Sequence, residues 1–330
     1  ELHGKALQRD STVELTIKYG FEHFINKNEK TAKSLVMYLD EQFKKDFKNN
    51  TEVEVSEKVD KVIQIFRYLQ DKDVFESFYK NYFAKRLLDQ RRVLEEAEKE
   101  VIKKLKEECG FNFTQRLEVM FRDIKMSEQR MQDFRKSPAS NQLSLELNAK
   151  VLTTGHWPNE SRDPTQQSQG QNLLERVSLP YEIKQCMSVF KQYYMTKFTG
   201  RQLYWKLNQG SADVRARIGA NGKRYEMTVS TYQMCILMLF NDARTITYHE
   251  LLQSLQLQEN DLKPHLIPLC QGKILLKTPN NKEFKMEDQL QVNFSYHNNL
   301  IKIKVPIMYS KKAIAQEQQD LSAKVEDDRK

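Results

Sequence analysis

The residue types that carry most catalytic and metal chemistry are scattered along this sequence. Its four cysteines, Cys109, Cys186, Cys235 and Cys270, contain no C-x-x-C pair, which argues against both a zinc site and a disulfide framework. The six histidines show no ligand spacing; they are His3, His23, His156, His249, His265 and His297. His249 and Glu250 are adjacent, but no second histidine completes an H-E-x-x-H metal pair.

Other motifs with chemistry are missing as well. The sequence has neither a G-x-x-x-x-G-K-[ST] nor a G-x-G-x-x-G loop for phosphate, and it has no G-x-S-x-G nucleophile turn. It therefore predicts no catalytic residues, no metal ligands and no cofactor, and it favours a scaffold or binding module over an enzyme. The cysteines lie in or beside apolar helical patterns, so we expect reduced, buried thiols and a cytoplasmic or nuclear protein.

Composition limits the class of protein further. A chain of 330 residues, 39% hydrophobic and 30% charged, predicts a folded, helix-rich protein of two or three domains. The apolar run at 234–240 is far shorter than the roughly 18 residues that a membrane span needs. The net charge of +8 leaves nucleic acid, an acidic membrane surface or an acidic protein as candidate partners. Neither end carries a start or stop signal, so we expect both to be cuts in a longer protein.

The elements that would position any site change in character along the chain. Apolar residues at three- and four-residue spacing predict a helical bundle at 31–137, with a helix end at Gly110. Between 138 and 229 we expect an α/β module. VLTTGHWP (151–158) has β-branched residues and no formal charge, which predicts a strand. A helix then precedes three antiparallel strands at 202–207, 212–218 and 225–229.

Residues 230–309 show three helices followed by strands, which is the order of a winged helix. The expected helix at 260–270 contains Pro264 and Pro268. An interior proline costs about 3 kcal/mol in a regular helix, so we expect this helix to be short or kinked. Residues 310–330 are expected to form a charged linker helix. The fold class is therefore α+β multidomain.

Six motifs, in the same order, resemble the cullin family, the scaffolds of multisubunit ubiquitin ligases. They are DKDVFESFYKNYFAKRLLDQ (71–90), KLKEECGFNFTQRLEVMFRDI (104–124), VLTTGHWP (151–158), YYMTKFTGRQLYW (193–205), STYQMCILMLFN (230–241) and KVEDDRK (324–330). The resemblance covers roughly residues 20–330. It implies the C-terminal region of a cullin, in which residues 1–30 end the last N-terminal repeat.

The resemblance also implies a non-catalytic scaffold. A strand of a RING-box protein would join its sheet, and a ubiquitin-conjugating enzyme would be positioned near the substrate. The RING-partner role falls on Val151, Leu152, Thr153, Thr154, Gly155, Trp157, Leu203 and Trp205. Lys44, Lys45 and Lys48 match the basic residues that attract the acidic tail of the conjugating enzyme. Zinc is expected only in the RING partner.

Further partners follow from the same resemblance. They are the exchange inhibitor and the deconjugating complex that regulate cullins, and substrate adaptors that bind repeats upstream of this chain. In the family a ubiquitin-like modifier is attached to a lysine of a second, C-terminal winged helix. We therefore expect the modification lysine to lie outside this chain.

Alternatives stay open at each of these sites. Residues 151–155 would pair within the 202–229 strands if no partner strand joins them, and the lysine cluster would be a solvated helix end if it recruits nothing. The rival function is a nucleic-acid-binding winged-helix protein. The expected helix at 260–270 offers only Lys263 and His265 to bases and phosphates, so we do not expect nucleic acid as a partner.

Overall fold

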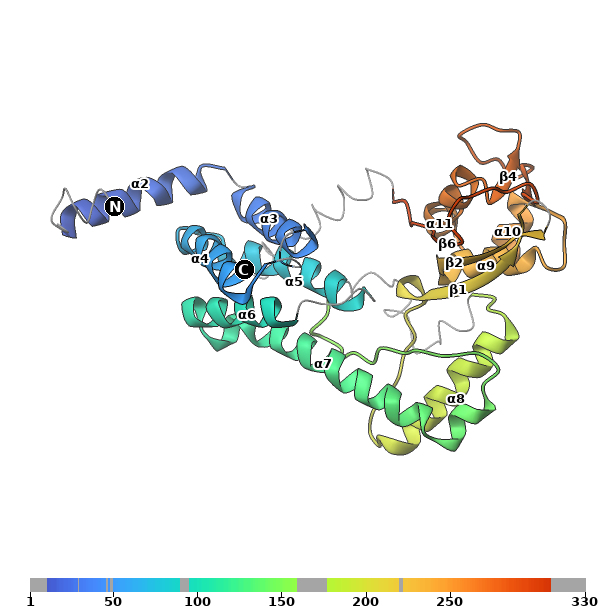
Figure 1. The fold of residues 1–330 in the computed structure, drawn as a ribbon, viewed down its shortest axis with the longest axis horizontal. Helices are drawn as coiled ribbons and strands as arrows, with labels where there is room; N and C mark the ends of the chain where they lie inside the picture. Colours follow the sequence, from blue (N-terminus) through green and yellow to red (C-terminus); the bar gives the residue numbers. More distant parts are fainter. Residues whose placement is uncertain are drawn as a thin grey trace. The chain divides into compact units, whose positions relative to one another are not determined.

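In the computed structural model the described residues are 11–28, 30–45, 47, 50–89, 95–158, 177–219 and 222–309. They form a helical N-terminal region followed by an α+β domain with two small sheets, as Figure 1 shows. They fall into two compact units. The first contains residues 11–131 and 149–158, and the second contains residues 132–148 and 177–309.

The first unit is built from helices, as the three- and four-residue spacing predicted. They are α2 (Ser11–Asn26), α3 (Thr31–Lys45), α4 (Glu52–Arg67), α5 (Lys72–Leu88), α6 (Glu95–Cys109) and α7 (Phe111–Arg135), which ends in the second unit. Thr51 and Glu54 form a capping box that starts α4. Gly110 separates α6 from α7 with a φ of +80°, a conformation that glycine adopts without strain.

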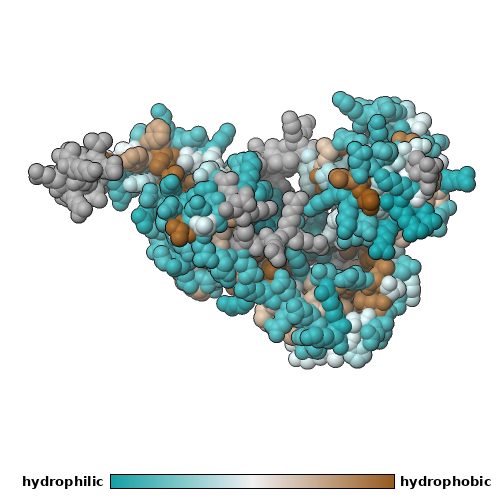
Figure 2. Space-filling model, viewed as in Figure 1, coloured by the Kyte–Doolittle hydropathy of each residue, from teal (hydrophilic) through white to brown (hydrophobic). Residues whose placement is uncertain are grey.

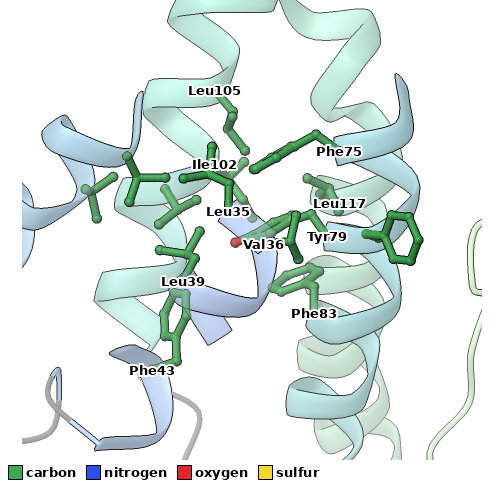
Figure 3. Packing of buried hydrophobic residues seen from close by; sticks show 14 of the residues in the cluster. Leu35, Val36, Leu39, Phe43, Phe75, Tyr79, Phe83, Ile102, Leu105 and Leu117 are labelled. Carbon is green, nitrogen blue, oxygen red and sulfur yellow. The ribbon is translucent and has the colours of Figure 1, made fainter. Parts of the chain in front are cut away.

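The core of this unit is apolar and rich in aromatic rings. Figure 3 shows Leu35, Val36, Leu39 and Phe43 of α3 facing the rings of α5, with side chains of α6 and α7 closing the cluster. Rings at four-residue spacing on α5 follow one another along one face, where Phe75 and Tyr79 stack at 5.8 Å. The aromatic stretch 71–90 therefore acts as the centre of the bundle wherever it is described.

One buried ion network interrupts this core. Arg86 of α5 donates hydrogen bonds to Asp40 of α3 at 2.7 Å and to Glu98 of α6 at 2.5 Å. The Tyr79 hydroxyl donates to the second oxygen of Glu98 at 3.0 Å. The guanidinium also lies 4.3 Å from the centroid of the Phe43 ring. A single arginine thus links three helices and pairs with both carboxylates, and Asp40 also pairs with Lys44 of its own helix.

The second unit combines helices with two three-stranded sheets. Its helical elements are η1 (Pro138–Gln142), α8 (Tyr181–Lys197), η4 (Leu207–Gln209), α9 (Thr231–Leu239), α10 (Tyr248–Leu255) and α11 (Glu259–Gln271). Its strands are β1 (Ser211–Arg217), β2 (Arg224–Ser230), β3 (Thr245–Thr247), β4 (Leu275–Thr278), β5 (Gln289–Val292) and β6 (Lys302–Lys304). The strand orders are β1-β2-β6 and β3-β5-β4.

The first sheet differs from the expected meander in two ways. Residues 202–206 are not a strand, because the main chain there turns into η4, where the Gly210 N–H donates to the Leu207 carbonyl at 3.2 Å. The third strand is instead β6, which runs parallel to β2 and comes from about 75 residues further along the chain. The expected antiparallel pairing of 212–218 with 225–229 is confirmed as β1 and β2.

The helix α11 continues through both of its prolines from Glu259 to Gln271. Pro268 cannot donate to the Pro264 carbonyl, and that carbonyl accepts the Met308 N–H instead, at 2.9 Å. A distant segment thus satisfies the hydrogen bond that the proline removes, and the helix is not shortened. One hydrophobic core extends from Val177 to Val305 and includes side chains on both sides of residue 230.

The start of α9 is tied to α11 through polar side chains. Ser230 and Gln233 form the capping box of α9, and the Ser230 hydroxyl lies 2.7 Å from Nδ1 of His265. His265 is 3% exposed, and its burial lowers its pKa to about 4. The imidazole is therefore neutral at physiological pH, and Nδ1 can accept a hydrogen bond from the Ser230 hydroxyl.

Candidate partner-binding site

Residues 151–157 are not a strand, which corrects the sequence-based prediction. They form an irregular segment that ends in a turn, in which Gly155 has a φ of +90°. The Val151 N–H donates to the Ser127 hydroxyl at 2.7 Å, and the Thr153 N–H donates to a carboxylate oxygen of Asp123 at 2.8 Å. Side chains of α7 therefore take the place that a neighbouring strand would fill.

Asp123 is the main anchor of this segment. Besides the Thr153 N–H, it accepts hydrogen bonds from the Thr153 hydroxyl at 2.8 Å and from Nε1 of Trp157 at 2.9 Å. The indole is 6% exposed and packs in the core of the first unit. Both ends of the turn thus meet at one buried carboxylate, which fixes the conformation of VLTTGHWP on α7.

Other main-chain groups of this segment are unpaired in the described part of the chain. The Val151 and Thr153 N–H groups bond to α7, whereas Leu152 and Thr154 make no such contact through their main chain. Among the described residues the main-chain groups of Leu152 and Thr154 have no hydrogen-bond partner. Leu152 is half-buried and packs against the bundle core, so its side chain is held there.

Lys150 fastens the start of the segment to α5. Its ammonium group donates to the carbonyl oxygens of Leu87 and Leu88 at 3.0 and 2.9 Å. These carbonyls belong to the last turn of the helix, which lacks its own donors and carries a partial negative charge. Burial lowers the pKa of Lys150 below its ordinary value. The sequence analysis did not single out this residue.

Asp123 and Ser127 were also missed, although the sequence carries a signal for them. They are four residues apart on α7 and share a face with the apolar residues Met120, Ile124 and Met131. Polar residues on a buried stripe need partners, and uncharged polar segments nearby in the sequence can supply donors. That rule would have pointed to a segment such as 151–157.

Leu203 and Trp205 belong to the second unit, whereas residues 151–157 belong to the first, so the two sets are described separately. Both are half-buried in the irregular segment before η4. The Trp205 ring lies 5.8 Å from the Phe190 ring of α8, and it packs against the core of the second unit. The Trp205 indole therefore supports the core of the second unit from the segment before η4.

The strand β1 has one paired and one open edge in the described part of the chain. On β2, the Glu226 N–H and the Thr228 carbonyl bond toward β6. Glu226 and Thr228 are the register partners of Arg215 and Asp213, so these two pairs are the ones without mutual hydrogen bonds in the antiparallel ladder. The main-chain groups of Asp213 and Arg215 consequently point to the open edge.

The predicted basic cluster is only partly free of local ion pairs. Lys44 lies 2.5 Å from Asp40, and Lys45 lies 2.5 Å from Glu41, each one helical turn earlier. Asp40 also accepts from Arg86, so Lys44 shares that carboxylate. Lys48 lies outside the described residues. Neither described lysine therefore presents an unopposed charge.

Two further observations concern the described ranges as a whole. No three histidine, cysteine, aspartate or glutamate side chains among these residues converge as a metal site would require. The same search range contains no helix that is long and apolar enough to cross a membrane.

Comparison with known proteins gives the family. Residues 1–131 match the cullin alpha solenoid domain, and residues 151–296 match the cullin alpha+beta domain. Cullin-3A of Arabidopsis thaliana is 38% identical over 328 residues, which cover 98% of this chain and 43% of the relative. Cullin-3 of Dictyostelium discoideum is 38% identical over 270 residues (81% and 33%), and Cullin-3 of Caenorhabditis elegans is 32% identical over 345 (95% and 43%).

The chain belongs to the cullin family. It spans less than half the length of these curated relatives. The resemblance drawn from the six sequence motifs is thereby confirmed.

Proposed function

We propose that this chain is part of the scaffold subunit of a cullin-RING ubiquitin ligase and contributes no catalytic residues of its own. In this role it binds a RING-box protein, which carries the zinc, and positions a ubiquitin-conjugating enzyme near the substrate. The observation that carries the proposal is the open edge of β1, where Asp213 and Arg215 present unpaired main-chain groups within the described part of the chain.

A partner strand on this edge would gain main-chain hydrogen bonds without displacing any element of the described part of the chain. Side chains along β1 alternate between half-buried and exposed, so one face of the sheet is distinct from the other. This difference would fix the register of an added strand. An unprotected edge otherwise favours aggregation, and a resident partner removes that liability.

The second proposed contact is the main chain of residues 151–154 in the first unit. The main-chain groups of Leu152 and Thr154 have no hydrogen-bond partner among the described residues, and Asp123 and Ser127 hold the segment through Val151 and Thr153. Val151, Leu152, Thr153, Thr154, Gly155 and Trp157 therefore remain proposed partner-binding residues. For Trp157 and Val151 the role is to hold the segment, since both are buried.

The experiment substitutes one residue of β1 in the chain co-expressed with a RING-box protein. Arg215→Pro removes an N–H that points to the open edge and leaves the ladder to β2 intact, and proline is tolerated on edge strands. We expect Arg215→Pro to weaken the zinc-containing complex by about tenfold or more, while Arg215→Ala, the matched control, copurifies like the wild type.

A melting curve separates loss of binding from loss of the fold. Strand addition at β1 is wrong if Arg215→Pro melts and binds like the wild-type chain. The scaffold proposal itself is contradicted if the wild-type chain does not copurify with a RING-box protein at moderate salt.

The basic cluster Lys44, Lys45 and Lys48 remains the proposed recruitment site for the conjugating enzyme. The pairs with Asp40 and Glu41 reduce its field, so its contribution should be mainly to the association rate and should weaken with salt. Regulation by the exchange inhibitor and the deconjugating complex, and the binding of adaptors by upstream repeats, belong to the same proposal.

We also propose the domain division of the sequence analysis, with a winged helix at 230–309. Its support is the element order α9, β3, α10, α11, β4, β5 and the antiparallel sheet β3-β5-β4. The rival nucleic-acid function finds little support on α11. His265 is buried there, and Lys263 is paired with Glu259 at 2.5 Å.

A further inference from the structure

A groove of about 440 Å³ lies between α6 and α7 in the first unit. Figure 1 shows the two helices side by side, and two ion pairs join them: Lys106 with Glu118 at 2.9 Å, and Lys125 with Glu95 at 3.5 Å. The groove belongs to neither the β1 edge nor the Lys44 cluster.

Helical spacing concentrates positive charge along both walls. Residues 99, 103 and 106 share one face of α6, and residues 122 and 125 share the facing side of α7. The cations are Lys99, Lys103, Lys106, Arg122 and Lys125, and Glu118 is the one anion that lines the groove within the described residues. The walls therefore carry a clear excess of positive charge.

Two of these cations lack a counter-ion among the described residues. Lys99, Lys106 and Lys125 are each within 4 Å of a glutamate of α6 or α7. Lys103 and Arg122 are exposed, and no carboxylate of the described residues pairs with either. They lie on opposite walls, so an acidic ligand in the groove would meet one on each side.

The floor of the groove is apolar and firm. Ile102 is 7% exposed, and the half-buried Phe121 stacks on Phe83 of α5 with ring centroids 6.4 Å apart. Much of the visible surface is hydrophilic, with hydrophobic residues in separate patches (Figure 2). An ordinary solvated helix face has lysines but no apolar floor between two charged walls.

We propose that this groove binds an acidic segment of a partner protein that also carries apolar side chains. The segment's carboxylates would pair with Lys103 and Arg122, and an apolar side chain would cover Ile102 and Phe121. The apolar floor favours such a peptide over a nucleic-acid backbone, because phosphates could pair with the cations but would make no apolar contact with Ile102 and Phe121. Arginine at the wall suits a carboxylate because its guanidinium can bind both oxygens.

The test measures binding of a fluorescent helical peptide of alternating leucine and glutamate clusters to the whole chain. We expect Lys103→Glu combined with Arg122→Glu to weaken binding by about a hundredfold, or tenfold for each charge. The milder pair Lys103→Gln and Arg122→Gln should lose less but remain measurable. The control pair, Lys27→Glu with Lys61→Glu, reverses two exposed charges elsewhere in the same unit and should bind like the wild type.

Specificity for the peptide is tested with two further probes. A glutamate peptide without leucine should bind more weakly, and a single-stranded oligonucleotide should bind without sensitivity to Lys103→Glu. The proposal is overturned if the wild-type chain does not bind the leucine–glutamate peptide, if the control pair loses as much as the groove pair, or if the oligonucleotide depends on the groove more strongly than the peptide does. None of these results bears on RING-box copurification.

Discussion

Replacing Asp123 with alanine should release the segment that contains VLTTGHWP from α7. The carboxylate accepts three hydrogen bonds: from the main-chain N–H and the hydroxyl of Thr153, and from the indole N–H of Trp157. Alanine leaves those donors without an acceptor while it keeps the helix. The perturbation is therefore local to the proposed partner-binding segment.

The size of the effect follows from which donors can reach water. Thr153 is exposed, so its hydroxyl can turn to solvent, whereas the indole N–H of Trp157 is buried. A buried donor without a partner costs about 1–3 kcal/mol, and a hydrogen bond to a charged group contributes about 1.5–3 kcal/mol. Removal of the desolvated carboxylate offsets part of this loss. We expect Asp123→Ala to lower the free energy of unfolding by about 3 kcal/mol.

Tryptophan fluorescence gives a direct assay, because the chain has only two tryptophans. In a Trp205→Phe background Trp157 alone reports on urea unfolding. Asp133→Ala changes an exposed aspartate of the same helix and should shift the transition by less than about 0.5 kcal/mol. If Asp123→Ala unfolds at the same urea concentration as Asp133→Ala, the buried carboxylate does not hold this segment.

Two further predictions concern buried charge. Arg86→Met leaves the buried Glu98 without its counter-charge and leaves Asp40 with Lys44 alone, so it should cost about 3–5 kcal/mol in chemical denaturation; an unchanged midpoint would contradict the network. His265 has a folded pKa of about 4, below the ordinary 6.5, so the unfolded chain binds the proton first as pH falls. Stability should therefore drop by about 3 kcal/mol between roughly pH 6.5 and pH 4, and His265→Asn should flatten this dependence in urea unfolding.

The helices were the most predictable part of this fold. Their apolar spacing is local, and the break at Gly110 depends on one residue's freedom to adopt a positive φ. The pairing of β1 with β2 was also predictable, since the two strands are separated by a short turn and Val214 alternates with exposed neighbours. In each case the residues that determine the element lie close together in the sequence.

The misses depend on contacts between distant residues. The β-branched residues of 151–154 fit a strand, but Asp123 and Ser127 of α7 supplied the hydrogen bonds that a strand would otherwise need. β6 reaches β2 across some 75 residues, a pairing that no local pattern encodes. The prolines of α11 were predicted to shorten or kink it; it is not shortened, because the Met308 N–H offsets the loss at the Pro264 carbonyl.

For the candidate sites, the sequence identified residues but not their ion pairs or their positions relative to one another. Lys44 and Lys45 read as a basic cluster, although each lies beside a carboxylate one turn away. The groove between α6 and α7 needs two helices to face each other, and only the structure brings Lys103 and Arg122 to its two walls. Helical spacing predicts which residues share a face, and it does not predict which face meets a partner.

Hydrogen–deuterium exchange of the chain with and without a RING-box protein tests the central claim most directly. The amides of Asp213 and Arg215 point to the open edge of β1 and have no partner among the described residues. Strand addition predicts that exchange in the peptide covering residues 211–217 slows strongly in the complex, while exchange in α10 does not change. A stable complex in which β1 exchanges as fast as it does in the isolated chain would contradict the proposal.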